Sequence, residues 1–258
     1  MGKISVVINT YNEEKKIRNT LESVKGFDEI IICDMYSEDR TCDIAKEYGA
    51  KVVMHKKEEI CEPARNFAIS NTLYEWVLVV DADELITNEL KNFLYEFIKN
   101  PGNYTAIKIP RFTYYFGEPI ELRYPDYNIR FFKKGIGSYP PYIHSTVEIK
   151  EGEIYTIDRK RRELAIVHKQ ERSISQLLQT LDKYTSLEVE KLKKKNAKIN
   201  LWIHFYKSLF LIFEKFFLKG GYKNGIKGFV VCTIEYGIYK FVVGCKYWEY
   251  LNGQNKKT

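Results

Sequence analysis

The sequence contains no Cys-x-x-Cys pair, no internal repeat and no low-complexity linker. Its five cysteines are odd in number, which disfavours a disulfide framework and a zinc site and fits a reducing cytoplasm. The first residues, MGKISVVINTYNEE, lack the apolar core and the cleavage site of a signal peptide. Hydrophobic residues make up 45% of the 258 positions and charged residues 29%. These observations together predict an ordered globular protein of the cytoplasm.

Positive charge is concentrated towards the carboxyl-terminal end. Residues 199–258 contain nine lysines and three glutamates, a net charge of +6 (9 − 3) out of +7 for the chain, with 15 of the 38 aromatic residues. Such a segment can bind nucleic acid or an anionic membrane surface. Because the lysines alternate with aliphatic as well as aromatic side chains, we expect a lipid surface and no nucleic acid. The alternative is an ordinary helical subdomain with solvated lysines.

The first hundred residues alternate between strand and helix patterns. Strands are predicted at 4–9, 30–33, 52–55 and 76–80, and helices at 13–24, 39–49, 63–71 and 87–98. This β-α-β order predicts an α/β fold of the Rossmann-like type, with a mostly parallel sheet and helices on both faces. Residues 1–102 therefore form the first of three expected parts.

The rest of the chain divides into a strand-rich part, 103–172, and a helical extension, 173–258. The extension opens with a charged helix over 173–195, followed by two apolar stretches at 201–218 and 229–245. The second stretch is near the length of a membrane span. Charged residues within both stretches favour helices that lie in the membrane interface over helices that cross it.

Polar side chains follow each predicted strand of the first part. Ligands bind parallel sheets at the carboxyl ends of the strands, so these residues mark the expected binding edge. Asp81, Asp83 and Glu84 come directly after the buried strand 76–80. Three carboxylates so close together repel one another unless a cation lies among them. Their alternative role, capping the next helix, is already filled by Thr87.

Four segments resemble the ordered motifs of family 2 glycosyltransferases with the GT-A fold: SVVINTYNEE (5–14), DMYSEDRT (34–41), ARN (64–66) and DADE (81–84). Within the family, the chain most resembles the lipopolysaccharide core glycosyltransferases that add β-glucose to the first heptose, through YPDY (124–127), RFF (130–132) and residues 225–249. The resemblance implies an inverting, metal-dependent hexosyltransferase with a UDP-sugar donor, glucose being the expected sugar.

The resemblance also implies a metal site. Asp83 is the expected direct ligand of Mg²⁺ or Mn²⁺, a cation that would stabilise the departing diphosphate. Asp81 is expected near the ribose or a metal-bound water, and Glu84 would orient either group. His168 or His144 could complete the metal shell, although a lone histidine is more often structural.

The donor nucleotide is expected along the first two strands. By resemblance, Thr10, Tyr11 and Glu13 contact uridine and ribose, and Asp34 accepts from uracil or a ribose hydroxyl. Arg65 would face uracil or phosphate, or be a surface arginine. Three further residues concern the loop itself: Asp39 is expected to cap the following helix, and Met35 and Tyr36 replace small residues of the family.

On the acceptor side, direct displacement requires a base. Asp126 is the first candidate, with a turn residue as its alternative, and Glu148 is a weaker candidate. The subgroup has His-Glu where this chain has His144-Ser145. Arg130 could bind a donor or acceptor phosphate, or face solvent.

The favoured acceptor is a lipopolysaccharide-core or lipid-linked saccharide, with the enzyme peripheral on the inner face of the cytoplasmic membrane. A peptide or capsular acceptor, or a non-catalytic membrane-surface protein that retains the fold, remains open. A nucleotidyltransferase is disfavoured, because the loop 10–14 is acidic and lacks the glycine-rich, basic character of a triphosphate-binding loop.

Overall fold

The computed structural model describes residues 2–58, 62–140, 146–170 and 173–255. The chain forms two compact units, Met1–Thr113 with Pro125–Lys169, and Tyr114–Tyr124 with Gln170–Thr258. The short segment Tyr114–Tyr124 thus belongs with the carboxyl-terminal helices, a placement that the sequence does not predict.

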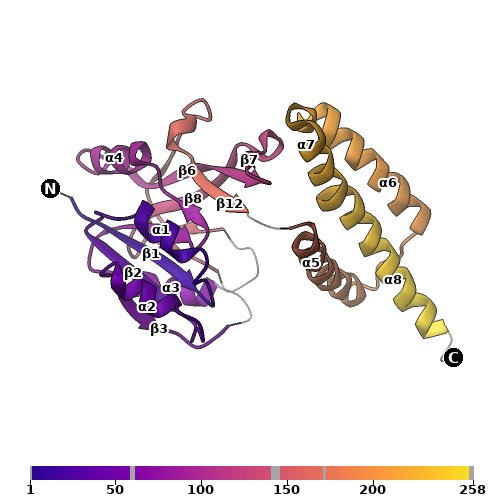
Figure 1. Cartoon of the computed structure of the whole chain (residues 1–258), viewed down its shortest axis with the longest axis horizontal. Helices are drawn as coiled ribbons and strands as arrows, with labels where there is room; N and C mark the ends of the chain where they lie inside the picture. Colours follow the sequence, from indigo (N-terminus) through magenta and orange to yellow (C-terminus); the bar gives the residue numbers. More distant parts are fainter. Residues whose placement is uncertain (1, 59–61, 141–145, 171–172, 256–258) are drawn as a thin grey trace. The chain divides into compact units, whose positions relative to one another are not determined.

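The first unit opens with the predicted alternation of strands and helices (Figure 1). The elements are β1 (Ile4–Thr10), α1 (Ile17–Ser23), β2 (Glu29–Asp34), α2 (Thr41–Glu47), β3 (Lys51–Met54), α3 (Glu62–Ser70), β4 (Trp76–Asp81), β5 (Glu84–Leu85) and α4 (Asn88–Phe97). Strand β1 pairs in parallel with both β2 and β4, and β2 pairs in parallel with β3. The predicted parallel sheet is confirmed.

The second half of the sheet is mainly antiparallel. Its strands are β6 (Tyr104–Tyr115), β7 (Glu118–Pro119), β8 (Asp126–Lys133), β11 (Glu153–Thr156) and β12 (Ile166–Gln170). Two short 3-10 helices, η1 (Glu121–Arg123) and η2 (Arg162–Leu164), lie in the connections between them. The main strand order is β3-β2-β1-β4-β8-β6-β12-β5, and β9 (Gly137–Ser138) and β10 (Glu148–Ile149) form a separate pair. Antiparallel pairing of β12 with β5 brings His168 opposite Glu84.

Successive residues of the central strands enter two different cores. Val6 and Leu78 pack with α1, α2 and α4 on one face, whereas Val7 and Val77 pack with α3 on the other. Because side chains alternate across a strand, a sheet covered on both faces requires the continuous apolar runs seen in β1 and β4. The predicted helices on both faces are confirmed.

Two helix starts follow from local hydrogen bonds. Thr87 caps α4, since its Oγ1 accepts a hydrogen bond from Leu90 N at 3.1 Å. Helix α1 begins at Ile17, four residues later than predicted, because the preceding backbone is bound elsewhere. Glu13 N donates to Thr41 Oγ1 and Glu14 N donates to Asp39 Oδ2.

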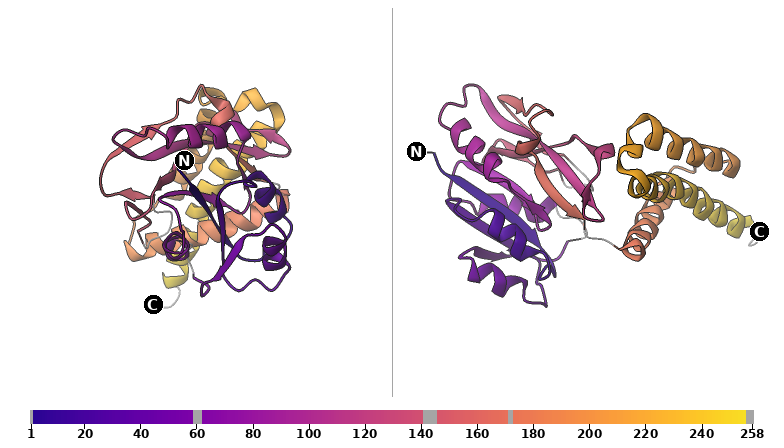
Figure 2. Two further views of the ribbon diagram at one scale, coloured as in Figure 1. Left: turned by 90° about the vertical axis from the view of Figure 1, so that its left-hand side faces the viewer. Right: turned by 45° about the horizontal axis from the view of Figure 1, so that its top comes forward.

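The second unit is helical: α5 (Ile174–Lys194), α6 (Leu201–Phe213), η3 (Glu214–Leu218), η4 (Gly221–Asn224), α7 (Gly225–Cys232), η5 (Thr233–Ile238) and α8 (Tyr239–Asn255). Helix α8 packs between α5 and α6 (Figures 1 and 2). Two glycines permit the close approach of α6. If Gly237 carried a side chain, its Cβ would lie only 2.4 Å from Ile212 Cγ1 of α6. A Cβ at Gly244 would likewise lie only 2.8 Å from His204 Cβ.

The excursion Tyr114–Tyr124 is tied to these helices by polar contacts. Asn224 Nδ2 donates to Pro119 O at 2.7 Å, and its Oδ1 accepts from Glu121 N at 3.1 Å. Glu235 in η5 accepts from the Tyr115 hydroxyl and pairs with Arg123. Burial alone would lower the pKa of Arg123, but the Glu235 charge together with Tyr115 and Tyr236 outweighs burial and raises the pKa. The excursion is therefore part of the packed helical unit.

Replacing the bridging amide should weaken this unit. We expect Asn224→Ala to lower the free energy of unfolding by about 1–3 kcal/mol, because two hydrogen bonds to the Tyr114–Tyr124 backbone are lost. Urea denaturation monitored by circular dichroism measures the loss. Asn252→Ala is the matched control, since Asn252 donates only within its own helix, to Trp248 O. Equal stability of the two variants would contradict the anchoring role.

Candidate functional site

Polar side chains gather at the carboxyl ends of β1, β2 and β4, the edge at which the sequence predicts a binding site. Asp34 is fully buried, and its Oδ2 accepts from Thr10 Oγ1 at 2.7 Å and from Ser37 Oγ at 2.6 Å. Its Oδ1 accepts from Ser37 N at 2.7 Å. Asp34 thus joins the ends of β1 and β2 from within. Asp34 is fully buried and accepts three hydrogen bonds from the protein, and its contact with uracil or a ribose hydroxyl stays a prediction.

The loops that follow β1 and β2 interlock above this aspartate. Asn12 N donates to Ser37 Oγ, and Asn12 Oδ1 accepts from Glu38 N, both at 2.8 Å. Asn12 and Tyr36 have positive φ angles of 54° and 60°. Left-handed backbone is unfavourable for a bulky residue, so the interlocked loops must hold Tyr36 in place. The Tyr36 side chain is 61% exposed at this edge.

The remaining donor-side residues line the same loops. Tyr11 and Glu13 are partly buried, and Lys57 Nζ lies 3.8 Å from the centroid of the Tyr11 ring. Glu13 Oε2 lies 3.4 Å from Lys16 Nζ. Burial raises the pKa of Glu13 despite this neighbour. The geometry leaves an aromatic ring and a carboxylate beside the buried Thr10.

Arginines supply the positive charge that the carboxylate cluster requires. Asp81 accepts from Arg65 of α3 and from Arg130 of β8, the latter at 2.6 Å. Burial alone would raise the pKa of Asp81, but Arg130 and Arg65 outweigh it and hold the pKa well below its usual range. Arg130 is only 5% exposed, which excludes the solvent-facing position considered from the sequence.

Glu84 connects Arg130 with a third arginine, Arg111, from a fully buried position. Its Oε1 accepts from Arg130 at 3.1 Å and from Arg111 at 3.0 Å, and its Oε2 accepts from Asp81 N at 3.0 Å. Arg111 also holds Asp126, with Nε and Nη2 at 2.9 and 2.5 Å from Oδ2. The carboxylates and guanidinium groups therefore alternate in one chain of ion pairs from Asp126 to Arg65.

Sequence reasoning missed Arg111. This residue lies on β6, in the strand-rich part where the strand register was not predicted. Its position opposite Asp126 follows from the antiparallel pairing of β6 with β8. A basic residue next to an aromatic strand segment gives no signal of its own, so only the strand pairing reveals its role.

Asp83 lies outside this chain of ion pairs and has different neighbours. Its Oδ2 is 3.4 Å from His168 Nε2 and 4.0 Å from Lys16 Nζ. Burial alone would raise the pKa of Asp83, but the hydrogen bond to His168 together with the charges of His168 and Lys16 outweighs burial and lowers the pKa. His168 is 7% exposed, and its Nδ1 has no hydrogen-bond partner in the part of the chain that the structure describes.

Asp83 and His168 offer a divalent cation one carboxylate oxygen, the ligand type that Mg²⁺ and Mn²⁺ prefer, and one imidazole nitrogen, which is less typical of them. Two adjacent ligands of an octahedral Mg²⁺ lie about 3 Å apart, close to the observed separation. Within the described ranges, no three His, Cys, Asp or Glu side chains are grouped so as to hold a metal. The protein would therefore supply two ligands, and phosphate oxygens and water the others, as is usual for Mg²⁺.

Two of the acceptor-side and metal candidates are not part of this cluster. Glu148 is exposed and pairs with Ser138 in the separate two-stranded sheet. His144 lies outside the described residues, so only His168 is placed near Asp83.

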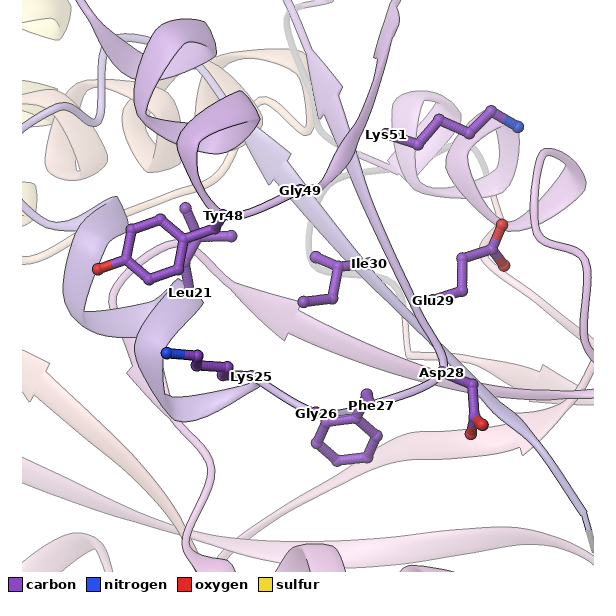
Figure 3. A pocket seen from close by; sticks show the side chains of 10 residues that line it. All are labelled: Leu21, Lys25, Gly26, Phe27, Asp28, Glu29, Ile30, Tyr48, Gly49 and Lys51. Carbon is purple, nitrogen blue, oxygen red and sulfur yellow. The ribbon is translucent and has the colours of Figure 1, made fainter.

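A pocket at the opposite end of β2 does not carry this chemistry (Figure 3). It has a volume of about 280 Å³ and includes Asp28 and Glu29 among its lining residues. Asp28 Oδ2 accepts from Ile4 N and the Tyr95 hydroxyl, whereas Glu29 Oε2 accepts from Ser5 Oγ and Leu73 N. These contacts are structural, so the binding edge remains the candidate site.

Comparison with known proteins assigns the chain to a family. The family model described as "Glycosyl transferase family 2" matches residues 5–148, more than half of the chain. The chain belongs to glycosyl transferase family 2. This family 2 glycosyltransferase is 31% identical over 244 residues to an uncharacterized glycosyltransferase of Rickettsia typhi, covering 89% of this chain and 82% of that protein.

Two further similarities are more limited. The glycosyltransferase is 40% identical over 91 residues to the SPbeta prophage-derived glycosyltransferase SunS of Bacillus subtilis, covering 34% of this chain and 22% of that protein. It is 23% identical to glucosyl-3-phosphoglycerate synthase from Mycobacterium tuberculosis, solved with Mn²⁺ and UDP, over 45% of each chain with a TM-score of 0.37.

The buried glutamate gives the first prediction for the site of this glycosyltransferase. We expect Glu84→Gln to lower the free energy of unfolding by about 3–5 kcal/mol, because two buried guanidinium groups lose a shared counter-charge. Thermal or urea denaturation measures the change. Glu163→Gln is the control, since the half-exposed pair with Arg161 should contribute less than about 1 kcal/mol. Similar losses in both variants would refute the special role of Glu84.

Proposed function

We propose that this family 2 glycosyltransferase transfers a hexose, with glucose as the favoured sugar, from a UDP-sugar to a lipopolysaccharide-core or lipid-linked saccharide, with inversion at the anomeric carbon. The main support for the proposal is the difference between the three carboxylates of the DADE segment. Among the DADE carboxylates, Asp81 and Glu84 are neutralised by arginines, whereas Asp83 faces His168 at a distance that suits a shared cation. The other support is membership of the family and the sequence resemblance to the lipopolysaccharide core subgroup.

On the donor side, Asp83 and His168 would hold Mg²⁺ or Mn²⁺, which supplies Lewis-acid stabilisation of the diphosphate leaving group. Tyr11, Glu13 and Thr10 are proposed to bind the uridine and ribose. Asp34 is proposed to fix the two loops behind them, through Thr10 and Ser37. These roles follow from the position of each residue at the carboxyl ends of the strands.

Two ion-paired residues complete the donor side. Asp81 is proposed to act near the ribose or a water molecule, because Arg65 and Arg130 already contact its carboxylate. Arg65, which is 15% exposed in its side chain, would face uracil or phosphate from the same position. Arg130 is more deeply buried and is proposed to hold Asp81 in place.

On the acceptor side, Asp126 is the proposed general base and Glu148 the weaker alternative. Arg111 binds Asp126 through Oδ2 alone, and no hydrogen bond to Oδ1 occurs among the described residues. The side chain is 34% exposed, so an acceptor hydroxyl can reach the second oxygen. Arg111 thus orients the carboxylate while one oxygen remains available to accept a proton.

The proposed acceptor places the enzyme on the cytoplasmic face of the inner membrane, as a peripheral protein. The lysine-rich helical unit supports this location, since lysines near an anionic surface contribute roughly 1 kcal/mol each. A peptide or capsular acceptor is the second candidate function. It keeps the same donor chemistry, and the absence of a carboxylate at Ser145, where the subgroup has glutamate, favours it.

The metal pair can be tested on the donor alone. We expect Asp83→Ala to reduce Mn²⁺-dependent hydrolysis of UDP-glucose at least about a hundredfold, because one of two protein ligands is removed. Released UDP measured with and without EDTA reports the effect. Asp43→Asn, at an exposed position of α2, is the control and should keep full hydrolysis. Unchanged turnover in Asp83→Ala would remove the metal assignment.

The base assignment predicts a different pattern. We expect Asp126→Asn to reduce sugar transfer to a saccharide acceptor by about 10²–10⁴-fold, because the acceptor hydroxyl loses its proton acceptor. Metal-dependent binding of UDP, measured by calorimetry, should change little. Glu148→Gln serves as the comparison: if it abolishes transfer and Asp126→Asn does not, the base is Glu148.

A further inference from the structure

Helix α6 and its continuation η3 present a wide aromatic surface to solvent. Trp202 is 71% exposed and Phe210 is 60% exposed. The surface, here called the α6 face, consists of Trp202, Tyr206, Phe210, Phe213 and Phe217, all more than half exposed. Their spacing of three or four residues puts them on one side of the helix. Ser208, on the opposite side, is buried in the helical unit.

The α6 face does not lie on the segment whose length and hydropathy suit a membrane span. Within the described residues, Gly221–Gly253 is the one helix long and apolar enough to cross a membrane, and 39% of its apolar window is buried. Several charged side chains along this segment bind inside the helical unit. Lys227 contacts Glu118 at 2.6 Å, and Lys246 contacts Asp182 of α5 at 2.7 Å.

Crossing a bilayer would break these contacts. The charges of Lys227, Glu235 and Lys246 would enter hydrocarbon without the partners that they now have, which is costly. Helix α5 could not follow them, because its exposed surface is rich in charged residues. The charged side chains of Gly221–Gly253 are thus engaged in contacts within the helical unit, and its exposed large apolar residues, such as Ile226 and Trp248, lie apart from the row of aromatic residues on α6.

We propose that the α6 face docks the protein on an anionic lipid bilayer, with α6 lying in the interface. Lys207, Lys219 and Lys223 are exposed next to this face and have no ion-pair partner in the described ranges. Aromatic side chains that enter the headgroup region and flanking lysines that bind lipid phosphates are the features of an interfacial helix. The proposal deepens the membrane part of the proposed function by naming the surface that makes contact.

A second copy of the chain is a poorer occupant of the α6 face. A two-fold contact would place the same surface of both copies together. The unpaired lysines beside the face would then repel one another, whereas an anionic bilayer complements them. The net charge of +6 over residues 199–258 acts in the same direction.

The test measures vesicle binding of the full chain, independently of sugar transfer. Vesicles of phosphatidylglycerol and phosphatidylethanolamine, and of phosphatidylcholine alone, are sedimented with the protein. We expect binding to the anionic vesicles, and the variant Trp202→Gln, Phe210→Gln, Phe213→Gln to reduce it at least about tenfold. Lys207→Glu, Lys219→Glu, Lys223→Glu should weaken binding and remove its salt dependence.

A matched control replaces three exposed leucines elsewhere: Leu73→Gln, Leu178→Gln and Leu187→Gln. It should bind like the unchanged protein, and circular dichroism and UDP-glucose hydrolysis should show that each variant is folded. If the unchanged protein hydrolyses UDP-glucose but does not bind vesicles, the docking proposal is wrong and the donor chemistry stands. If it binds vesicles but does not hydrolyse UDP-glucose, the donor chemistry is wrong and the docking proposal stands.

Two further measurements separate the other occupants. The variant Trp248→Phe retains Trp202, which is exposed, and Trp76, which is buried and should not respond to lipid. Its tryptophan fluorescence should therefore shift to the blue on anionic vesicles as Trp202 enters the bilayer interface. Alkaline carbonate should extract the bound protein. Resistance to carbonate would overturn the proposal in favour of a span. A dimer that the α6 triple variant converts to a monomer, without vesicle binding, would overturn it in favour of a second copy.

Discussion

The alternation of carboxylates and guanidinium groups at the sheet edge is the interaction on which the candidate site depends. Three acids, Asp126, Glu84 and Asp81, meet three arginines in one continuous chain of contacts. A buried charge without a partner is costly, so the equal numbers allow the group to sit within the protein. Asp83 differs from the other carboxylates of the DADE segment in having a histidine and a distant lysine as neighbours. The pairing thus leaves Asp83 as the carboxylate of this segment with no arginine contact among the described residues.

The same pairing links the two sides of the proposed reaction. Arg111 contacts both Asp126, on the acceptor side, and Glu84, beside the donor residues. A change in charge at either end would be felt through the arginines, because interactions in a buried network are strongly coupled. The chain between Arg111 and Asp126 includes Tyr114–Tyr124, which is packed in the helical unit. The strands that carry the ion pairs are therefore continuous with the second unit.

In the helical unit, hydropathy and exposure point to different segments. Part of Gly221–Gly253 packs against α5 and α6, 39% of its apolar window is buried, and its glycines allow α6 to approach closely. Helix α6 is apolar on a side that no other described helix covers, as the exposure of Trp202 and Phe210 shows. Apolar composition alone cannot separate a helix that packs in a core from one that meets a lipid surface. The two cases differ in where the apolar side chains of the helix point, towards other helices or towards solvent.

The sequence by itself determined the local elements and the edge of the sheet at which the polar side chains gather. The apolar runs of β1 and β4, the Thr87 cap and the polar residues at the strand ends follow from short-range periodicity, and each lies where it was predicted. Tertiary structure decided which side chains meet. Arg111 reaches Asp126 through the pairing of β6 with β8, and His168 reaches Asp83 through the pairing of β12 with β5. Strand register depends on contacts between distant segments, so a local pattern does not encode it. For the same reason, the burial of Asp34 and the outward side of α6 became visible only in the packed fold.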